Sequence, residues 1–192
     1  MYAASPPLRA PAHTPLLSAR LTLRPYLPSD QAAFFQVIDE DRPRLRPAFP
    51  NREASVQHLP DAATVLAMFA QDWQAGRLYV FGIWHTQTQA YLGDISLKPN
   101  WTTPISAEIG YYLSAAAEGH GYAREALAAI VPFGFTTLRA ERLLIRCRAD
   151  NPRSCAVAES AAFTPLPPRP RLLQPCADRS IRYYIRRREE TR

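Results

Sequence analysis

The sequence has few of the residues that mark several common protein classes. Only 3 of its 192 residues are cysteine, and Cys147, Cys155 and Cys176 follow no metal-ligand spacing. This odd number argues against a disulfide framework and favours a reduced, cytoplasmic setting, with no metal site expected. No apolar run approaches the roughly 20 residues that a membrane-spanning helix needs, so we expect no membrane partner.

Lysine is almost absent from the chain. Lys98 is its only example, so arginine supplies nearly all of the 23 basic residues and of the excess behind the net charge of +6. Such a skew is typical of biased genomic composition. The basic residues form no stripe interleaved with exposed aromatic residues, and we therefore do not expect a nucleic acid partner. The positive excess can still attract an anionic ligand.

Length and composition favour a single domain. A chain of 192 residues with 47% hydrophobic residues can bury a substantial core. Residues 1–19 contain no basic segment that leads into an apolar run, so we interpret them as a flexible N-terminal arm rather than a signal peptide. Residues 20–192 show no internal repeat, and we expect them to form one domain.

Hydrophobic periodicity predicts alternating strands and helices. Apolar–polar alternation predicts strands over 20–27, 77–85, 90–98, 107–114, 142–148 and 180–187. Helical spacing predicts helices over 28–41, 54–75, 119–138 and 150–163, the last capped by Asp150 or Asn151. We expect loops at 42–52 and 164–179, which are rich in proline. Pro132 should end or kink its helix, because it lacks a backbone donor.

One segment, AEGHGYAREALAAI at residues 117–130, places two glycines directly before a helical pattern. Backbone N–H groups in such a turn, together with the unpaired amides of a helix start, can bind an anion. A turn that needs glycine for steric reasons alone would give the same pattern. A Rossmann motif is excluded because Arg124 replaces its third glycine, and a P-loop is excluded because no lysine follows.

The wider context of this segment carries a family resemblance. EIGYYLSAAAEGHGYAREAL resembles the acetyl-CoA-binding segment of the GNAT superfamily of N-acetyltransferases, closest to the branch of ribosomal-protein N-terminal (Rim-type) acetyltransferases. NPRSCAVAESAAF resembles the branch pattern that follows it, and LTLRPY and AYLGDISL resemble its first and third strands. The likeness spans 20–187. It implies an α/β, GNAT-type acyl-CoA N-acyltransferase fold, with a mixed, mostly antiparallel sheet of about seven strands flanked by helices.

The chain departs from the family pattern at three positions. Glu118 stands at the start of the family's phosphate-binding segment, where the superfamily often has Gln or Arg. A carboxylate near a pyrophosphate is unfavourable unless it points to solvent, but the main contacts come from backbone amides, so we expect binding to persist. Ala162 replaces the usual glycine before Phe163. Pro132 is unusual in the long helix. None of these changes removes a motif.

The resemblance implies a reaction and its partners. An acetyl group would pass directly from acetyl-CoA to a primary amine, with a protein or peptide N-terminus as the preferred acceptor. A small-molecule amine acetyltransferase and an inactive acyl-CoA-binding sensor are the alternatives. The resemblance also makes a homodimer possible, because dimers are common in this branch.

The resemblance further implies which residues bind acetyl-CoA. The pyrophosphate would lie on the backbone amides of the glycine segment, with a charged contact from Arg124 and backbone pairing of the pantetheine further upstream. The implied residues are Tyr112, Leu113, Gly119, His120, Gly121, Tyr122, Ala123, Arg124 and Asn151.

Two residues are the candidates for catalysis. Glu108 would be the base that accepts the proton of the amine, and Ser154 would donate to the leaving thiolate. Alternatively, Glu108 is an outward-facing strand carboxylate, and Ser154 and Asn151 only cap a helix. We interpret His120 as a solvent-facing loop residue. Of Tyr183 and Tyr184, one should face the core and the other the cleft.

Overall fold

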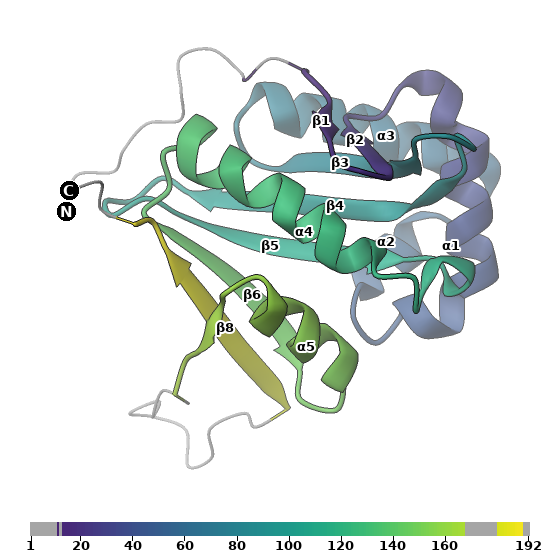
Figure 1. Ribbon diagram of the computed structural model, residues 1–192. Coiled ribbons are helices and arrows are strands. Elements are labelled where there is room, and N and C mark those ends of the chain that lie inside the picture. Colours follow the sequence, from purple (N-terminus) through teal and green to yellow (C-terminus); the bar gives the residue numbers. More distant parts are fainter. Residues whose placement is uncertain (1–10, 12, 168–179, 190–192) are drawn as a thin grey trace, which may run out of the picture.

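The structure is a computed structural model that describes residues 11, 13–167 and 180–189. The described residues form one eight-stranded sheet with helices on both faces (Figure 1). The strands are β1 (Leu16–Leu17), β2 (Leu21–Arg24), β3 (Tyr79–His85), β4 (Tyr91–Asn100), β5 (Ser106–Leu113), β6 (Arg142–Arg148), β7 (Thr164–Pro165) and β8 (Ile181–Arg187). The helices are α1 (Gln31–Leu45), α2 (Pro50–Ser55), α3 (Leu59–Gln74), α4 (Tyr122–Pro132) and α5 (Pro152–Ser160).

The sheet confirms the expected mixed, mostly antiparallel topology. Its strand order is β1-β2-β3-β4-β5-β6-β8-β7, and only the β5–β6 pair is parallel. The short strands β1 and β7 bring the count to eight. Because β1 pairs with β2, the sheet extends into the segment that was expected to be an arm.

The parallel pair is the feature that positions the site. Residues 106–109 of β5 pair with residues 142–145 of β6, and the ladder then stops. Both strands continue beyond it and diverge, as Figure 1 shows. We call this region, residues 110–113 and 146–148, the divergence. Among the described residues, the edges of β5 and β6 that face each other there have no partner strand.

Each face of the sheet has its own hydrophobic core. On one face, Leu127 and Ile130 of α4 pack with sheet residues such as Phe81 and Ile95. On the other face, apolar residues of α1 and α3 pack around Tyr112 of β5. No helix in the described part of the chain has the length and apolar character to cross a membrane.

The predicted loop over 42–52 is too long, since residues outside the helices are limited to 46–49. Helix α1 continues through Pro43 to Leu45, and α2 begins at Pro50. Two contacts explain why proline does not end α1 sooner: Leu45 is buried, and the buried Glu53 carboxylate pairs with the Arg46 guanidinium at 3.2 Å. Packing and ion pairing therefore override the local preference.

The predicted helices shift at their ends. The helix predicted over 54–75 begins only at Leu59, after α2 has ended. The one predicted over 119–138 is α4, which ends at Pro132 and continues as a π-helical turn over Phe133–Thr137. This change fits the missing N–H of Pro132, because the wider turn rearranges the hydrogen bonding beyond it. Strand β6 has the predicted bounds.

Candidate active site

The loop between β5 and α4 has the geometry of an anion site. Gly119 and Gly121 have φ values of 80° and 81°, a left-handed conformation that favours glycine. Within the described chain, no side chain caps α4, and the N–H groups of residues 119–121 have no backbone acceptor. The first amides of the helix, at Tyr122 and Ala123, likewise have no intrahelical partner. We call residues 119–123 the phosphate loop.

Neighbouring side chains hold the phosphate loop in place. Arg20 donates through Nη2 to the carbonyl of His120 at 3.1 Å and pairs with Glu125 of α4 at 2.7 Å. Its guanidinium also lies 4.6 Å from the centre of the Tyr122 ring. His120 is exposed, in agreement with its interpretation as a loop residue, and Arg124 is exposed in the first turn of α4. The loop is thus anchored from its outer side.

The Glu118 carboxylate does not simply point to solvent. It forms ion pairs with Arg44 of α1 and, at 2.8 Å, with Arg153 of α5. The side chain of Glu118 is 37% exposed. Two guanidinium groups therefore offset its charge beside the phosphate loop.

Backbone direction decides which residues of β5 face the divergence. The N–H of Ser114 donates to the carbonyl of Leu92 in β4, at 2.8 Å. Because successive residues of a strand direct their N–H and C=O groups to opposite edges, Tyr112 also faces β4. The backbone N–H and C=O groups of Tyr111 and Leu113 then point to the divergence. The backbone groups of Leu113 therefore point where the expected pairing with pantetheine needs them. Those of Tyr112 point to β4 instead, and those of Tyr111 point to the divergence.

Ser154 lies in a small polar cluster at the divergence. Its hydroxyl is 3.0 Å from the Tyr111 hydroxyl of β5 and donates to the Cys147 sulfur of β6 at 3.3 Å. The Tyr111 hydroxyl also donates to the Ser154 carbonyl, at 3.3 Å. Three elements, β5, β6 and α5, thus meet at one hydroxyl group.

Burial keeps the partners of Ser154 protonated. It raises the pKa of the Cys147 thiol to about 11, although the hydrogen bond from Ser154 opposes the shift. Burial also raises the pKa of Tyr111 well above its usual value. Both groups are therefore neutral at pH 7. Cys147 is no activated nucleophile, since a reactive cysteine has a lowered pKa.

The cap of α5 uses the backbone N–H of Ser154 and not its hydroxyl group. The side chain of Asn151 accepts a hydrogen bond from the Ser154 backbone N–H at 3.0 Å, as its predicted capping role requires. The Ser154 side chain takes no part in this bond. Capping alone therefore explains Asn151 but does not explain the position of the Ser154 hydroxyl.

Glu108 lies on the opposite face of the sheet from this cluster. Its side chain is 46% exposed, and a carboxylate oxygen lies 3.7 Å from Nε of Arg146 on β6. Glu108 is in the paired part of β5, directly before the divergence. Tyr183 of β8, which pairs in register with Arg146, is 46% exposed on this face, while Tyr184 is buried. Of these two tyrosines, Tyr184 thus faces the core, and Tyr183 lies on the exposed side of β8.

A buried ion pair supports this second face. Arg52 of α2 pairs with Asp94 of β4, which also accepts from the Tyr26 hydroxyl at 3.0 Å. Burial by itself lowers the pKa of Arg52, but the Asp94 carboxylate more than offsets this, so the net shift is upward. The guanidinium lies 5.5 Å from the centre of the Tyr112 ring. The Tyr112 side chain thus belongs to this network.

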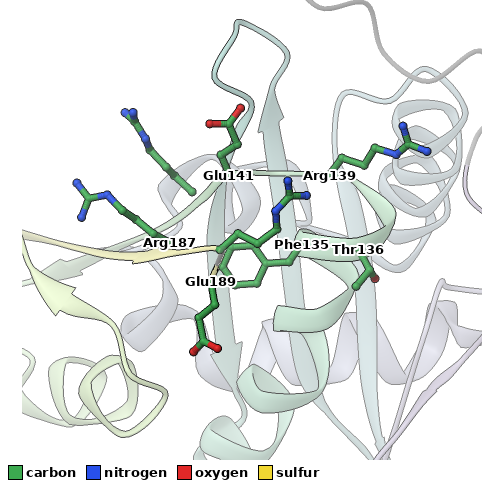
Figure 2. A pocket seen from close by; sticks show the side chains of 8 residues that line it. Phe135, Thr136, Arg139, Glu141, Arg187 and Glu189 are labelled. Atoms are coloured by element: carbon green, nitrogen blue, oxygen red, sulfur yellow. The ribbon is translucent and has the colours of Figure 1, made fainter. Parts of the chain in front are cut away.

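An open depression of about 1020 Å³ lies at the other end of the sheet. Figure 2 shows Arg139 and Arg187 extending to opposite sides of it, with Phe135 between them. These residues flank the start of β6 and the end of β8, where the strands are still paired. The depression contains none of the predicted site residues. Groups of three or more metal-ligating side chains are also not found among the described residues.

Comparisons with known proteins agree with this arrangement. Residues 20–164 match the family described as "Acetyltransferase (GNAT) domain". An uncharacterized N-acetyltransferase of Bacillus subtilis, YoaA, is 26% identical over 137 residues, which cover 68% of this chain and 77% of that protein. A ribosomal-protein-serine acetyltransferase of Escherichia coli is 40% identical over 58 residues, which cover 30% of this chain and 32% of that protein.

A solved structure shows the same fold. A putative ribosomal-protein-serine acetyltransferase from Vibrio cholerae superposes with a TM-score of 0.73 at 22% identity, covering 91% of this chain and 98% of that one. At this identity the likeness concerns the fold.

Sequence reasoning did not find several residues of the site. Tyr111 could have been found, because it alternates with the buried Ile109 and therefore faces the same side of the sheet as α5. Nothing in the sequence linked Arg44, Arg153 or Arg52 to its acidic partner. Their acidic partners lie 74, 35 and 42 residues away in the chain.

Proposed function

We propose that this protein, which belongs to the acetyltransferase (GNAT) domain family and is an acetyl-CoA-dependent N-acetyltransferase, acetylates the α-amine of a protein or peptide N-terminus. Acetyl-CoA supplies the activated acetyl thioester. At the divergence, one face of the sheet is suited to bind the acetyl donor, and the opposite face is suited to receive the amine acceptor.

The donor side fits acetyl-CoA. The phosphate loop offers several backbone amides that lack partners, and positive φ values at two glycines aim them together. Such a loop at a helix start suits a pyrophosphate. The edge of β5 at the divergence offers backbone groups of Tyr111 and Leu113 to an extended chain such as pantetheine. A backbone N–H there can stabilise charge on a thioester oxygen.

Ser154 is positioned to assist the leaving group. Its hydroxyl already donates to one sulfur, that of Cys147, so the local geometry suits an O–H···S contact. When the Tyr111 hydroxyl turns its one proton from the Ser154 carbonyl to Ser154 Oγ, Ser154 can still donate onward. We assign Ser154 the role of donor to the thiolate, and Tyr111 the role of positioning it.

The single observation that carries the acceptor assignment is the place of Glu108. Its side chain is 46% exposed, one residue before the ladder ends, on the face of the sheet opposite α5 and Ser154. A carboxylate here can accept a proton from an amine that approaches from this face, directly or through one water. The 3.7 Å contact with Arg146 is long and leaves carboxylate lone pairs available.

The α-amine matches this modest base. A peptide α-amine has a reference pKa of about 7.7–8.0, whereas lysine has about 10.4, so far more of the α-amine is neutral at pH 7. An exposed carboxylate is therefore an adequate base for an α-amine and a poor one for a lysine side chain. The Escherichia coli relative, named a ribosomal-protein-serine acetyltransferase, supports a protein acceptor.

A thiol-release assay with acetyl-CoA tests the proposal. Peptides with free N-termini should release CoA, and the same peptides with blocked N-termini should not. Release only with polyamines, amino acids or other small amines would move the enzyme to the small-molecule class. Binding of acetyl-CoA without release over the whole panel would instead identify an acyl-CoA-binding sensor.

A further inference from the structure

Glu118 forms ion pairs with two arginines, Arg44 and Arg153, and among the described residues only Arg44 is held by a further carboxylate. Arg44 is held by a second carboxylate, since Asp41 accepts from it at 2.9 Å. Asp41 is itself buried and accepts the backbone N–H of Ala115 at 2.8 Å. Arg153 is 81% exposed, and in the described part of the chain Glu118 is the only carboxylate with which it forms an ion pair. Arg44 is therefore fixed, whereas Arg153 can move.

The position of this triad is as informative as its contacts. Glu118 directly precedes Gly119 of the phosphate loop, which follows β5, and Arg153 stands in the first turn of α5, which follows β6. The Glu118–Arg153 pair thus connects the two segments that flank the divergence. A phosphate bound on the loop amides would lie beside this pair.

We propose that Arg153 binds a phosphate group of acetyl-CoA, and that Glu118 holds Arg153 in place until that phosphate arrives. An exposed ion pair contributes little free energy, so its loss costs little. A guanidinium–phosphate pair is a strong, charge-assisted contact. Arg44 remains on Glu118 after the exchange and offsets its charge, which explains how a carboxylate is tolerated next to an anion site.

The proposal predicts opposite signs for three neighbouring substitutions. Glu118→Gln removes the competitor of the phosphate and should tighten acetyl-CoA binding about threefold, the scale of an exposed ion pair. Arg153→Gln should weaken binding about tenfold, because a charge-assisted contact is lost. Arg44→Gln should weaken it about threefold, because no arginine then offsets the Glu118 charge once Arg153 has moved to the phosphate. The double variant Glu118→Gln/Arg153→Gln should bind no better than Arg153→Gln with Glu118 intact.

Isothermal titration of the full chain with acetyl-CoA, 3′-dephospho-CoA and pantetheine measures these effects. If the Arg153→Gln effect disappears with dephospho-CoA, Arg153 binds the 3′-phosphate; if it persists, Arg153 binds the pyrophosphate. Pantetheine binding should not respond to any of the three changes. Asp72→Asn and Arg77→Gln, which alter an exposed pair at the α3–β3 turn, are matched charge controls and should leave the Kd unchanged.

Two results would overturn the proposal. One is a Glu118→Gln protein that binds acetyl-CoA as the wild type does or more weakly, and the other is an Arg153→Gln protein with unchanged affinity. These measurements concern donor binding alone. If the predicted signs appear but peptides with free N-termini are not acetylated, the proposed acceptor is wrong and the role of Arg153 stands.

Discussion

The two faces of the sheet at the divergence are built in different ways. On the face of α4 and α5, the site consists of backbone amides and a part-buried hydroxyl cluster around Ser154. On the opposite face, Glu108 and Arg146 form a long, exposed ion pair, and the order comes from the buried Arg52–Asp94 pair deeper in the protein. In our proposal, the face that binds the donor is preorganised by the fold itself, and the face that binds the acceptor is ordered by side chains.

This difference bears on what each face recognises. Backbone amides and a strand edge suit a ligand that is the same throughout a family, because they persist through most substitutions. Exposed side chains change easily, and so does the acceptor that they select. One fold can therefore keep its donor while its acceptors vary.

The largest effect is expected from breaking the buried pair under the acceptor face. Asp94→Asn leaves the Arg52 guanidinium buried without a counter-charge and should lower the free energy of unfolding by about 3–5 kcal/mol. Chemical denaturation measures this change. Asp72→Asn, in the exposed pair with Arg77, should cost at most about 1 kcal/mol. Equal costs for the two variants would show that the Arg52–Asp94 pair does not order this face.

The hydroxyl cluster on the donor face gives the next effect. Ser154→Ala should lower kcat about a hundredfold, the scale of an assisted proton transfer, with little change in acetyl-CoA affinity. The helix cap survives, since Asn151 binds the Ser154 backbone N–H. Steady-state kinetics and a binding titration separate the two quantities. An unchanged kcat would remove Ser154 from the reaction.

The phosphate loop should respond through its backbone. Gly121→Val forces a β-branched residue into a left-handed conformation and should weaken acetyl-CoA binding about tenfold, since that conformation costs roughly 1–2 kcal/mol. Gly110→Ala, on the acceptor face, meets only ordinary contacts at 3.7 and 3.8 Å. It should leave acetyl-CoA affinity unchanged. If both variants bind equally well, the loop is not the anion site.

The smallest effect is expected at Glu108. Glu108→Gln should lower kcat/KM for a peptide α-amine about fivefold at pH 7, and the deficit should shrink towards pH 9, because an amine of pKa about 7.7–8.0 then deprotonates without help. A pH–rate profile of both proteins measures this. A deficit that stays constant with pH would assign Glu108 to acceptor binding rather than to proton transfer.

Much of the donor side could be predicted from the sequence. Glycines before a helical pattern, and Asn-Pro before the next helix, are local signals whose geometry hardly depends on distant residues. The glycine turn before α4, the cap of α5 and strand β6 were found in this way.

The remaining features depend on contacts between distant residues. Helix α1 continues past Pro43 because of Leu45 and Glu53, which local propensity does not reveal. Tyr111, and not the predicted Tyr112, directs its backbone groups to the divergence. This depends on which edge of β5 pairs with β4, which the sequence does not reveal. Likewise, the proline- and arginine-rich segment gave no sign that Arg52 pairs with Asp94, because the partner lies 42 residues further on.

The central claim is that acetyl transfer at this divergence is directed to an α-amine. The most direct test is to incubate the enzyme and acetyl-CoA with one peptide that carries both a free N-terminus and a lysine, and to map the acetylated nitrogen by mass spectrometry. Our account predicts modification of the α-nitrogen at pH 7, weaker in the Glu108→Gln protein. Acetylation of the lysine, or of neither nitrogen while small amines are acetylated, would contradict it.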